Sequence, residues 1–539
     1  MLMRQIIRWL FAIFLFVMVL WWQRFDLVLL SLRQNGGSDY DDVSYIHAYK
    51  AHPIQSLHRE AVQTFESMIK AQSKTFTDAV AEYVRRYRRP PPPGFDKWFD
   101  SAMLKGSVII DEFDIVNDCI EPFWRIDPEV LRDLVQQASG ATHLHNIRIR
   151  NGTLETEDDD WIGREIASFL GNLSESLPDL DICHNTLDEP RVILPENPSI
   201  TNVTWSDGSK QSAWNTTSKP CTYRPLSHSK LSSIEMQHLP FITDQRSAID
   251  ICQNPSLQSF HGFFIAPTTL LTTEQPVPVL SAAAPSTLSD ILYPSPWYDN
   301  FFISDLDEHD LEWSQKADKL YWAGSTTGGW NRDSPHSDAS LFSKSHRHRF
   351  IEMTNNLDTQ RVYRFLRVAK NKLWTWYKTT DLQTELYDTK FTRAVQCDKA
   401  ECERLEHLYN IGPFDDRHTA YKHKLLMDLD GNSFSGRFYN FLASRSCPLK
   451  QTVFREWHDE RLRPWVHYVP ISTGMEELPE VVRYLTLTDE GKEIAEKIAQ
   501  YGRVAHRDTL RRDDKGLYLY RLFLEYARVT SSEREDIKR

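Results

Sequence analysis

The clearest structural signal in the chain is the stretch Lys424-Leu-Leu-Met-Asp-Leu-Asp-Gly-Asn-Ser-Phe-Ser-Gly-Arg437. Its apolar first half predicts a buried strand, and its polar second half predicts a loop that runs into a helix. Ligands of an open parallel sheet bind where the strands end. The hydroxyl of Ser435 and the guanidinium of Arg437, placed at the start of a helix, suit an anion there. A plain surface turn is the alternative.

The same pattern occurs further upstream, where the strand-like Leu320-Tyr-Trp322 runs into Gly324-Ser-Thr-Thr-Gly-Gly329. The amides and hydroxyls of such a loop can bind a diphosphate, which makes Gly324, Ser325 and Thr327 candidates. The loop lacks the lysine and the spacing of the standard phosphate motifs, so an ordinary Ser/Thr/Gly turn is the alternative. Because short apolar strands and amphipathic helices alternate in this half of the chain, we expect an α/β fold with a parallel sheet.

Two arginines, Arg347 and Arg349, follow in the segment His346-Arg-His-Arg-Phe350. Two guanidiniums beside a phosphate loop suit bidentate binding of oxygen atoms, and a solvated basic turn is the alternative. A zinc site at His346 and His348 is disfavoured, because side chains two positions apart on a helix diverge and no cysteine lies near them.

Asp188 is a candidate general base. It follows the apolar residues Leu180 and Ile182, so that its carboxylate would lie at a strand end, where it could face a ligand. A surface turn is the alternative. Further on, Glu456-Trp-His458 and Pro464-Trp-Val-His-Tyr468 concentrate aromatic and polar side chains, which stack on sugars or bases. A tryptophan-rich core is the alternative there.

The composition indicates a compact globular protein with room for about three domains or two large ones. Of the 539 residues 41% are hydrophobic, and 16 Trp, 21 Tyr and 27 Phe rule out a mostly disordered chain. The net charge of −12 argues against a nucleic-acid partner. Seven cysteines are too few for a disulfide scaffold. We expect Cys397 and Cys402 to close a small disulfide loop and at least one thiol to stay free, although each cysteine could instead be a small buried hydrophobe.

The N-terminus indicates where the protein resides. Trp9–Trp22 is an unbroken apolar run, which spans a membrane if Arg8 reaches back to the head groups. Basic residues precede the run and acidic residues follow it, which predicts a single-pass type II membrane protein with its body in the lumen of the Golgi apparatus or endoplasmic reticulum. A cleaved signal peptide and a buried soluble helix are alternatives. Four N-x-Ser/Thr sequons also favour a lumenal body: those at Asn151, Asn172, Asn202 and Asn215.

Other segments predict further elements. We expect a helix over 54–88 that ends before Pro90-Pro-Pro-Pro-Gly94, and we expect the aromatic residues after that segment to pack it down as a strap. The remaining expectations are a strand at 108–113, a short βα-sized element at 481–485, a helix that starts at Thr488 and stops near Gly502, and an apolar closing helix at 517–526.

Taken together and in order, these motifs resemble the capsule-associated (CAP) glycosyltransferases of family 90, which include protein O-glucosyltransferases and fungal xylosyltransferases. The resemblance rests on residues 321–329, 346–350, 422–437, 454–457 and 464–470. Further upstream, Pro90–Gly94, Asp111–Asp114 and Leu177–Asp188 are similar to the fungal branch, and the resemblance spans roughly residues 85–530.

This resemblance implies a GT-B architecture, in which two Rossmann-like domains face a cleft, here preceded by an N-terminal membrane anchor helix. It also implies inverting transfer of xylose or glucose from a UDP-sugar to a glycan or protein hydroxyl, with no metal and no other cofactor. The domains are then a cytosolic tip and anchor (1–32), a stem (33–53), an acceptor-side domain with the strap and a glycosylated insertion (54–300), a nucleotide-sugar-binding domain (301–505) and the closing helix (506–539).

By position, the resemblance implies that Asp188 is the base acting on the acceptor hydroxyl. It implies nucleotide-sugar contacts for the loop residues Gly324, Ser325, Thr327, Ser435 and Arg437, and for Glu456 a contact with the nucleotide hydroxyls. The chain departs from the family at Ala323, where many relatives carry an arginine that binds the diphosphate. Arg347, Arg349 or Arg437 would then have to neutralise the leaving group.

Two other functions compete with an active transferase. The departure at Ala323 favours a catalytically weakened glycan-binding protein that keeps the fold. A glycoside hydrolase would need two carboxylates that flank one bond, and Asp188 and Glu189 are too close in sequence to do so.

Overall fold

The structure is a computed structural model that describes residues 50–198, 200–223, 233–236, 239–332 and 345–534. Ala48–Arg539 forms a compact unit of its own. The predicted anchor at 1–32 and all but the end of the predicted stem at 33–53 lie outside the described residues. Among the described helices, none has both the length and the apolar character that a membrane crossing requires.

Five parallel strands form a sheet in the C-terminal half, in the order β14-β11-β15-β16-β18. Every residue of β15 is buried, which fits the continuous apolar run of a central parallel strand. The strands predicted at 320–322 and 424–429 are therefore confirmed, and with them the α/β class. The bounds are β11 Ala317–Ser325, β14 Tyr387–Arg393, β15 His423–Leu429, β16 Cys447–Gln451 and β18 Val469–Pro470.

A second, mixed sheet lies in the N-terminal half, in the order β10-β8-β3-β1-β2. Strands β3, β8 and β10 run parallel, whereas β1 is antiparallel to both of its neighbours. Asp188 follows the carboxyl end of β3, as predicted for a residue at a strand end. The bounds are β1 Leu144–Arg150, β2 Thr153–Glu155, β3 Leu180–Asn185, β8 Val279–Ser281 and β10 Ile291–Leu292.

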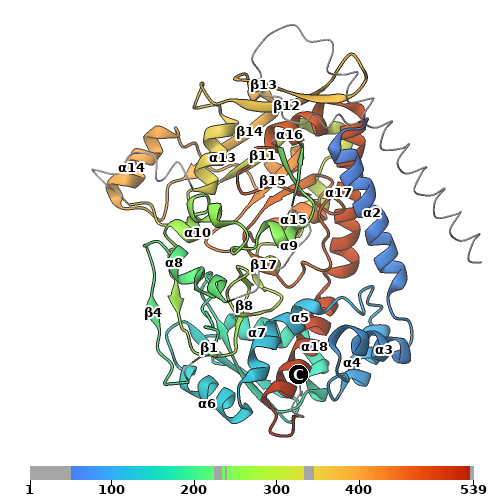
Figure 1. Cartoon of the computed structure of the whole chain (residues 1–539), viewed down its shortest axis with the longest axis vertical. Coiled ribbons are helices and arrows are strands. Elements are labelled where there is room, and N and C mark those ends of the chain that lie inside the picture. The colour runs from blue at the N-terminus through green and yellow to red at the C-terminus, as the bar shows by residue number, and fades with distance from the viewer. Residues whose placement is uncertain (1–49, 199, 224–232, 237–238, 333–344, 535–539) are drawn as a thin grey trace, which may run out of the picture. The chain divides into compact units, whose positions relative to one another are not determined.

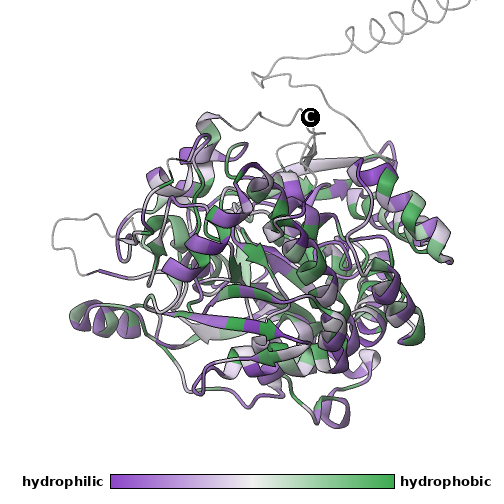
Figure 2. Ribbon diagram, turned by 90° about the horizontal axis from the view of Figure 1, so that it is seen from below, coloured by the Kyte–Doolittle hydropathy of each residue, from purple (hydrophilic) through white to green (hydrophobic). Residues whose placement is uncertain are grey.

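The two sheets have separate hydrophobic cores. A helix from the C-terminal end of the chain packs at the N-terminal sheet, and a helix from near the N-terminal end packs at the C-terminal sheet. The C-terminal helix α18 (Arg512–Thr530) packs with α4, α5 and α7 in the core of the mixed sheet. The N-terminal helix α2 (Pro53–Ala71) packs on α17 (Asp489–Thr509) at the parallel sheet (Figure 1). In Figure 2 the hydrophobic colouring follows the central strands, while hydrophilic residues colour much of the peripheral helices.

The remaining elements are short. The other helices are α3 Phe76–Tyr87, α4 Phe95–Leu104, α5 Asp114–Ile120, α6 Pro128–Ala138, α7 Trp161–Leu170, α8 Trp214–Thr217, α9 Gln245–Ala248, α10 Gly262–Ile265, α11 Trp297–Asn300, α12 Leu306–His309, α13 His346–Thr354, α14 Lys399–Leu408, α15 Phe438–Ala443 and α16 Leu478–Leu487. Two-stranded pairs are β12 Tyr363–Val368 with β13 Trp374–Thr379, β17 Arg455–Glu456 with β9 Ala283–Ala284, β4 Ser206–Asp207 with β7 Leu271–Thr272, and β5 Ser233–Met236 with β6 Leu239–Ile242.

The prediction of one helix over 54–88 is wrong, because the chain breaks between α2 and α3. Gln72, just after α2, accepts hydrogen bonds on its side-chain oxygen from the amides of Ile110 and Asp111, at 2.7 and 2.9 Å. Residues 108–113 are consequently held by this side chain, and the strand predicted for them does not form. Thr75 then caps α3 by accepting a hydrogen bond from the amide of Asp78.

The polyproline segment is a packed strap, as predicted. Arg528 of α18 donates to the carbonyl of Pro90 at 2.6 Å, and the indole of Trp98 donates to the carbonyl of Leu517 at 3.0 Å. The closing helix is confirmed by α18. Two other predictions are wrong: residues 481–485 lie within the single helix α16, and α17 continues past Gly502, whose small size admits the carbonyl of His467.

Candidate functional site

Two loops lie side by side at the carboxyl edge of the parallel sheet. They follow β11 and β15, which are neighbours in the sheet, and we call residues 326–332 the Gly loop and residues 430–437 the Asn-Ser loop. The amide of Gly328 donates to the side-chain oxygen of Asn432 at 3.3 Å, which joins the two loops. The structure therefore brings together the two loops that the sequence singled out.

The glycines of the Gly loop permit close packing of the backbone. Gly328 and Gly329 have φ values of 101° and 146°, in the left-handed region that favours glycine. A Cβ atom on Gly262 of α10 would lie 1.6 Å from the carbonyl oxygen of Gly328. The amide of Trp330 donates to the carbonyl of Ala266 at 2.7 Å. Several of the amides expected to bind phosphate are thus engaged within the protein.

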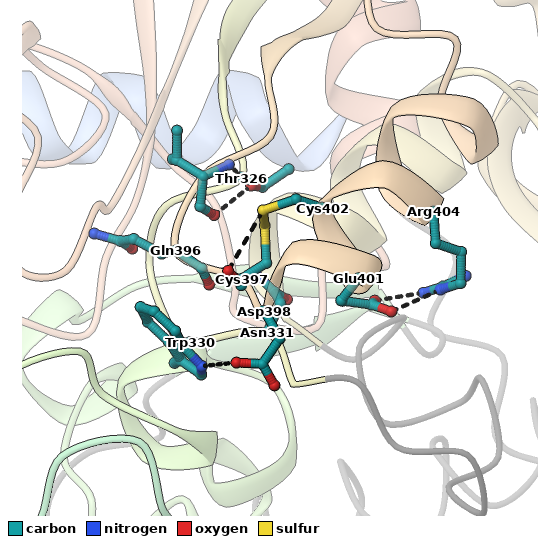
Figure 3. Close-up of a disulfide and its surroundings, with 10 residues drawn as sticks. Thr326, Trp330, Asn331, Gln396, Cys397, Asp398, Glu401, Cys402 and Arg404 are labelled. Atoms are coloured by element: carbon teal, nitrogen blue, oxygen red, sulfur yellow. Dashed lines mark hydrogen bonds and ion pairs between the residues drawn. A yellow bond between two sulfur atoms is a disulfide. The ribbon is translucent and has the colours of Figure 1, made fainter.

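A segment that leads into a disulfide, residues 395–402, also contacts the Gly loop (Figure 3). Cys397 and Cys402 form the predicted disulfide, and three thiols elsewhere in the described chain are free and buried. The Thr326 hydroxyl donates to the carbonyl of Val395 at 2.8 Å and accepts from its amide at 2.9 Å. Asn331 pairs with the same segment, because its amide donates to the carbonyl of Gln396 at 2.7 Å. The segment therefore fixes both ends of the Gly loop.

Arg347 is a buried brace between the two strand ends. It lies in the first turn of α13 and is 6% exposed, so the alternative of a solvated basic turn is wrong. Its guanidinium donates to the carbonyls of Asp430 and Ser325, at 2.7 and 3.0 Å, and to the hydroxyl of Thr327. Burial and the nearby positive charge of Arg437 lower the pKa of Arg347 to about 9. An anion near Thr327 would relieve this crowding of like charges.

Arg349 does not join Arg347 at the loops. Its guanidinium donates to the carbonyls of Phe260, Thr473 and Gly474, and burial lowers its pKa to about 10. The nucleotide contact expected for Arg349 stays a prediction.

Arg437 is the cation of the site with hydrogen-bond donors left for a ligand. It is half-buried, and Nη1 donates to the carbonyl of Ala323 at 2.7 Å. Among the described residues, no other hydrogen bond is found for its guanidinium, which leaves donors for a ligand. Ser325 and Thr327 are half-buried beside it with their hydroxyl oxygens 3.2 Å apart, and Gly324 precedes them. Ser435 is buried at the end of the Asn-Ser loop, and the nearby Ser433 hydroxyl has no partner among the described residues.

Asp188 reaches this site from the mixed sheet. The side-chain amide of Asn432 donates to its Oδ2 at 3.1 Å. The residue is open to solvent, yet the protein around it raises the pKa of the carboxyl above its usual range, against the opposing effect of the Asn432 hydrogen bond. A raised pKa suits a general base that must accept a proton near neutral pH. The neighbouring Glu189 is buried and accepts from the amides of Thr268 and Thr269, at 3.0 and 3.1 Å.

Glu456 lies apart from the loops, in a buried polar network. It is 1% exposed, accepts a hydrogen bond from Tyr298 at 2.5 Å and lies 3.4 Å from the ammonium of Lys450. Burial raises its pKa to about 8. The nucleotide contact expected for it stays a prediction.

His346, one of the pair considered for zinc, is occupied within the protein. One ring nitrogen lies 2.9 Å from the carbonyl of Asp430, and the ring stacks on His261 at 3.9 Å. Asp305, His309 and His418 form a group with the spacing of metal ligands, but Arg417 donates to two of them. A second such group comprises His145, Glu157 and Asp159. Neither group includes a residue of the candidate site.

Sequence reasoning missed Asn432 as a functional residue. Its side chain is the link between the two loops and Asp188. Its position directly after a buried strand was the available signal, because polar side chains at that edge face the ligand site.

A comparison with known protein families gives a match in the C-terminal part of the chain, which includes part of the candidate site. Residues 376–538 match the model of Glycosyl transferase family 90. This part of the chain is similar to family 90. The match includes Ser435, Arg437 and Glu456, whereas Asp188, the Gly loop, Arg347 and Arg349 precede it. The resemblance expected from residue 85 onward is thus supported by this model from residue 376, and the fungal branch stays a prediction.

Curated proteins that are similar to part of this chain include protein O-glucosyltransferases. Protein O-glucosyltransferase 3 of Rattus norvegicus is 33% identical over 108 residues, which cover 20% of this chain and 21% of that protein. Protein O-glucosyltransferase 3 of Homo sapiens is 33% identical over 116 residues (21% and 22%), and protein O-glucosyltransferase 1 of Homo sapiens is 30% identical over 113 residues (20% and 28%). The aligned part spans between a fifth and three tenths of these relatives.

Proposed function

We propose that the protein transfers a sugar, glucose or xylose, from a UDP-sugar to a hydroxyl group of a glycan or protein, with inversion at the anomeric carbon. The observation that carries the proposal is the 3.1 Å hydrogen bond that joins Asp188 to Asn432. It links a carboxylate that follows one sheet to the loop pair of the other sheet, which carries an arginine and several hydroxyls. In a single displacement the base and the leaving-group site must face the same sugar from opposite sides, and this arrangement allows it.

In the proposed reaction the acceptor oxygen attacks the anomeric carbon while the bond from that carbon to the diphosphate breaks. Asp188 takes the acceptor proton. The diphosphate gains negative charge as it leaves, and Arg437, Ser325 and Thr327 stabilise it, with Arg347 behind them. These donors are the basis for proposing that no metal is needed.

We place this reaction in a GT-B arrangement, with the donor on the parallel sheet and the acceptor on the mixed sheet. The proposed location is the lumen of the Golgi apparatus or endoplasmic reticulum, with the anchor at 1–32. Two disulfides, Cys221–Cys252 and Cys397–Cys402, support an oxidising compartment. The asparagines of all four sequons are exposed, as glycosylation requires: Asn151, Asn172, Asn202 and Asn215.

The test uses residues 40–539, secreted without the anchor. Release of UDP from a panel of UDP-sugars is measured with candidate acceptors, with and without EDTA, for the wild type and Asp188→Asn. Release that is selective for one sugar, resists EDTA and is lost in the variant is the expected result. Loss of release in EDTA would overturn the metal-free mechanism alone.

The alternative function is a glycan-binding protein that keeps the transferase fold with weakened activity. Ala323 is the observation that favours it, since its side chain supplies no guanidinium to the diphosphate. Absence of both turnover and UDP-sugar binding in the wild type would favour this alternative. The buried, hydrogen-bonded state of Glu189 counts against a hydrolase with Asp188 and Glu189 as its carboxylate pair.

A further inference from the structure

Asn432 makes three hydrogen bonds with three different segments. Its Nδ2 donates to Oδ2 of Asp188 at 3.1 Å, and its Oδ1 accepts from the amide of Gly328 at 3.3 Å and from the hydroxyl of Thr268 at 3.2 Å. A backbone amide can only donate, so the side-chain oxygen of Asn432 must face Gly328. The amide nitrogen is then left to face the carboxylate, and this orientation is the one that satisfies all three bonds.

The two ends of Asp188 are held independently. Its turn is fixed by Asn185, whose side chain donates to the carbonyl of Glu189 at 2.8 Å and accepts from the amide of Leu187 at 3.1 Å. Its carboxylate has one hydrogen-bond partner among the described residues, which is Asn432. Rotation of the carboxylate is therefore restrained only by Asn432, and that bond leaves Oδ1 available to accept a proton.

We propose that Asn432 is a positioning residue that aims the Asp188 carboxylate at the acceptor hydroxyl and couples it to the donor-binding Gly loop. The inference rests on the proposed function. Because Gly328 is hydrogen-bonded to Asn432, a displacement of the Gly loop also moves Asn432, which holds the Asp188 carboxylate. The carboxylate is therefore best aligned when the Gly loop is in its donor-bound position. Asn432 itself need not touch the reacting atoms.

The charged groups around Asp188 determine how loss of the Asp188–Asn432 hydrogen bond would change the pH dependence of activity. Glu189 is the adjacent acid, and its carboxylate is turned to Thr268 and Thr269. Arg347 and Arg437 are the cations of the facing loops. The Asn432 hydrogen bond favours the ionised carboxylate and so lowers the pKa of Asp188. Its removal raises that pKa, and activity is then lost at a higher pH as the solution is acidified.

The test compares Asn432→Asp, Asn432→Ala and Thr268→Val with the wild type in the secreted protein. Asn432→Ala removes the donor to Asp188 and adds no charge. Asn432→Asp keeps the size of the side chain and its acceptor oxygens and also removes the donor, but its negative charge by itself raises the pKa of Asp188. Thr268→Val removes one of the two hydrogen bonds to Oδ1 of Asn432 and leaves the bond to Asp188. Rates of UDP release are measured across pH with the sugar nucleotide and acceptor that the wild type uses, together with UDP affinity by calorimetry and the melting temperature.

Asn432→Asp and Asn432→Ala are expected to lower kcat by about 10- to 100-fold, the range of a lost hydrogen bond to a charged group. Both should shift the acid limb of the kcat/KM profile to higher pH and should lower kcat by a larger factor than UDP affinity, since Asn432 contacts the base directly and the Gly loop through one hydrogen bond. Thr268→Val should leave the acid limb in place. An unshifted limb in Asn432→Ala, or an equal shift in Thr268→Val, would overturn the inference alone. A wild type without turnover would overturn the proposed function and the inference with it.

Discussion

Nη1 of Arg437 lies 2.7 Å from the carbonyl oxygen of Ala323 and donates a hydrogen bond to it. Ala323 belongs to β11 and Arg437 to the Asn-Ser loop, and Ala323 is where the family resemblance leads one to expect an arginine. The positive charge is thus present at the end of β11, but it comes from the Asn-Ser loop. Trp322 lies beneath both cations, 5.8 Å from Arg437 and 5.6 Å from Arg347.

Replacement of Arg437 by alanine should weaken UDP binding by about 10- to 100-fold, because hydrogen bonds to charged groups contribute about 1.5–3 kcal/mol. Arg437→Lys should keep part of the affinity, since it retains the charge and loses the planar guanidinium. Calorimetric titration with UDP measures both. Arg367→Ala, a change at an exposed arginine of β12, serves as the charge control. If Arg437→Ala binds UDP as the wild type does, Arg437 does not hold the leaving group.

Asp188→Asn should abolish turnover and spare UDP binding, because the amide keeps the shape of the carboxylate and cannot take the proton. In the wild type, kcat/KM should fall as the pH drops through the pKa of Asp188. That fall should occur above pH 4, because an ordinary aspartate titrates at about 3.9 and desolvation by the surrounding protein raises the pKa of Asp188. A pH series of initial rates tests this, with the exposed Asp181→Asn as control. Substantial turnover in Asp188→Asn would remove Asp188 from the role of base.

Loss of the Cys397–Cys402 disulfide should reduce UDP affinity, because the residues directly before it, Val395 and Gln396, hold both ends of the Gly loop. The matched control is Cys221–Cys252, with both cysteines of either pair changed to alanine. Chain-entropy estimates give about 2 kcal/mol for the shorter loop and about 4 kcal/mol for the longer, whose cysteines are 5 and 31 residues apart. We therefore expect the control to lose more stability in thermal unfolding but less UDP affinity. The reverse order of affinities would contradict this role.

Gly262→Ala should weaken UDP binding without touching the nucleotide. The added Cβ would lie 1.6 Å from the carbonyl oxygen of Gly328, so the Gly loop must move. Gly412→Ala is the control, because no atom lies within 4 Å of its added Cβ. UDP titration and thermal unfolding of both variants give the comparison. Equal affinity in the two variants would mean that the Gly loop accommodates the shift without consequence for the ligand.

The strands and loops that carry the site could be predicted from sequence because their signals are local. An apolar run before a polar, glycine-containing segment identifies β11 and β15, and parallel order then brings their loops together. The roles of Arg347 and Arg349 could not be predicted in this way. They lie two positions apart in one short segment, and only tertiary packing places Arg347 at the strand ends and Arg349 against Thr473 and Gly474.

The break between α2 and α3 could not be predicted from the sequence, for a similar reason. Residues 72–75 continue a helical pattern of moderate propensity, and the helix ends there because Gln72 binds the amides of Ile110 and Asp111, far along the chain. Tertiary hydrogen bonds of this kind outweigh local propensity. Glu456 illustrates the opposite case, since nothing in its sequence context distinguishes a buried network from a ligand contact.

Arg347 holds the two loops by carbonyl oxygens, those of Ser325 and Asp430, which every amino acid possesses. The frame of the site is for this reason largely independent of the side chains displayed on it. Directed evolution of donor preference could therefore randomise Ser325 and Ser433 together while Arg347, Gly262 and Gly328 are kept constant. Most members of such a library should fold, so a screen would sample altered recognition more than loss of structure.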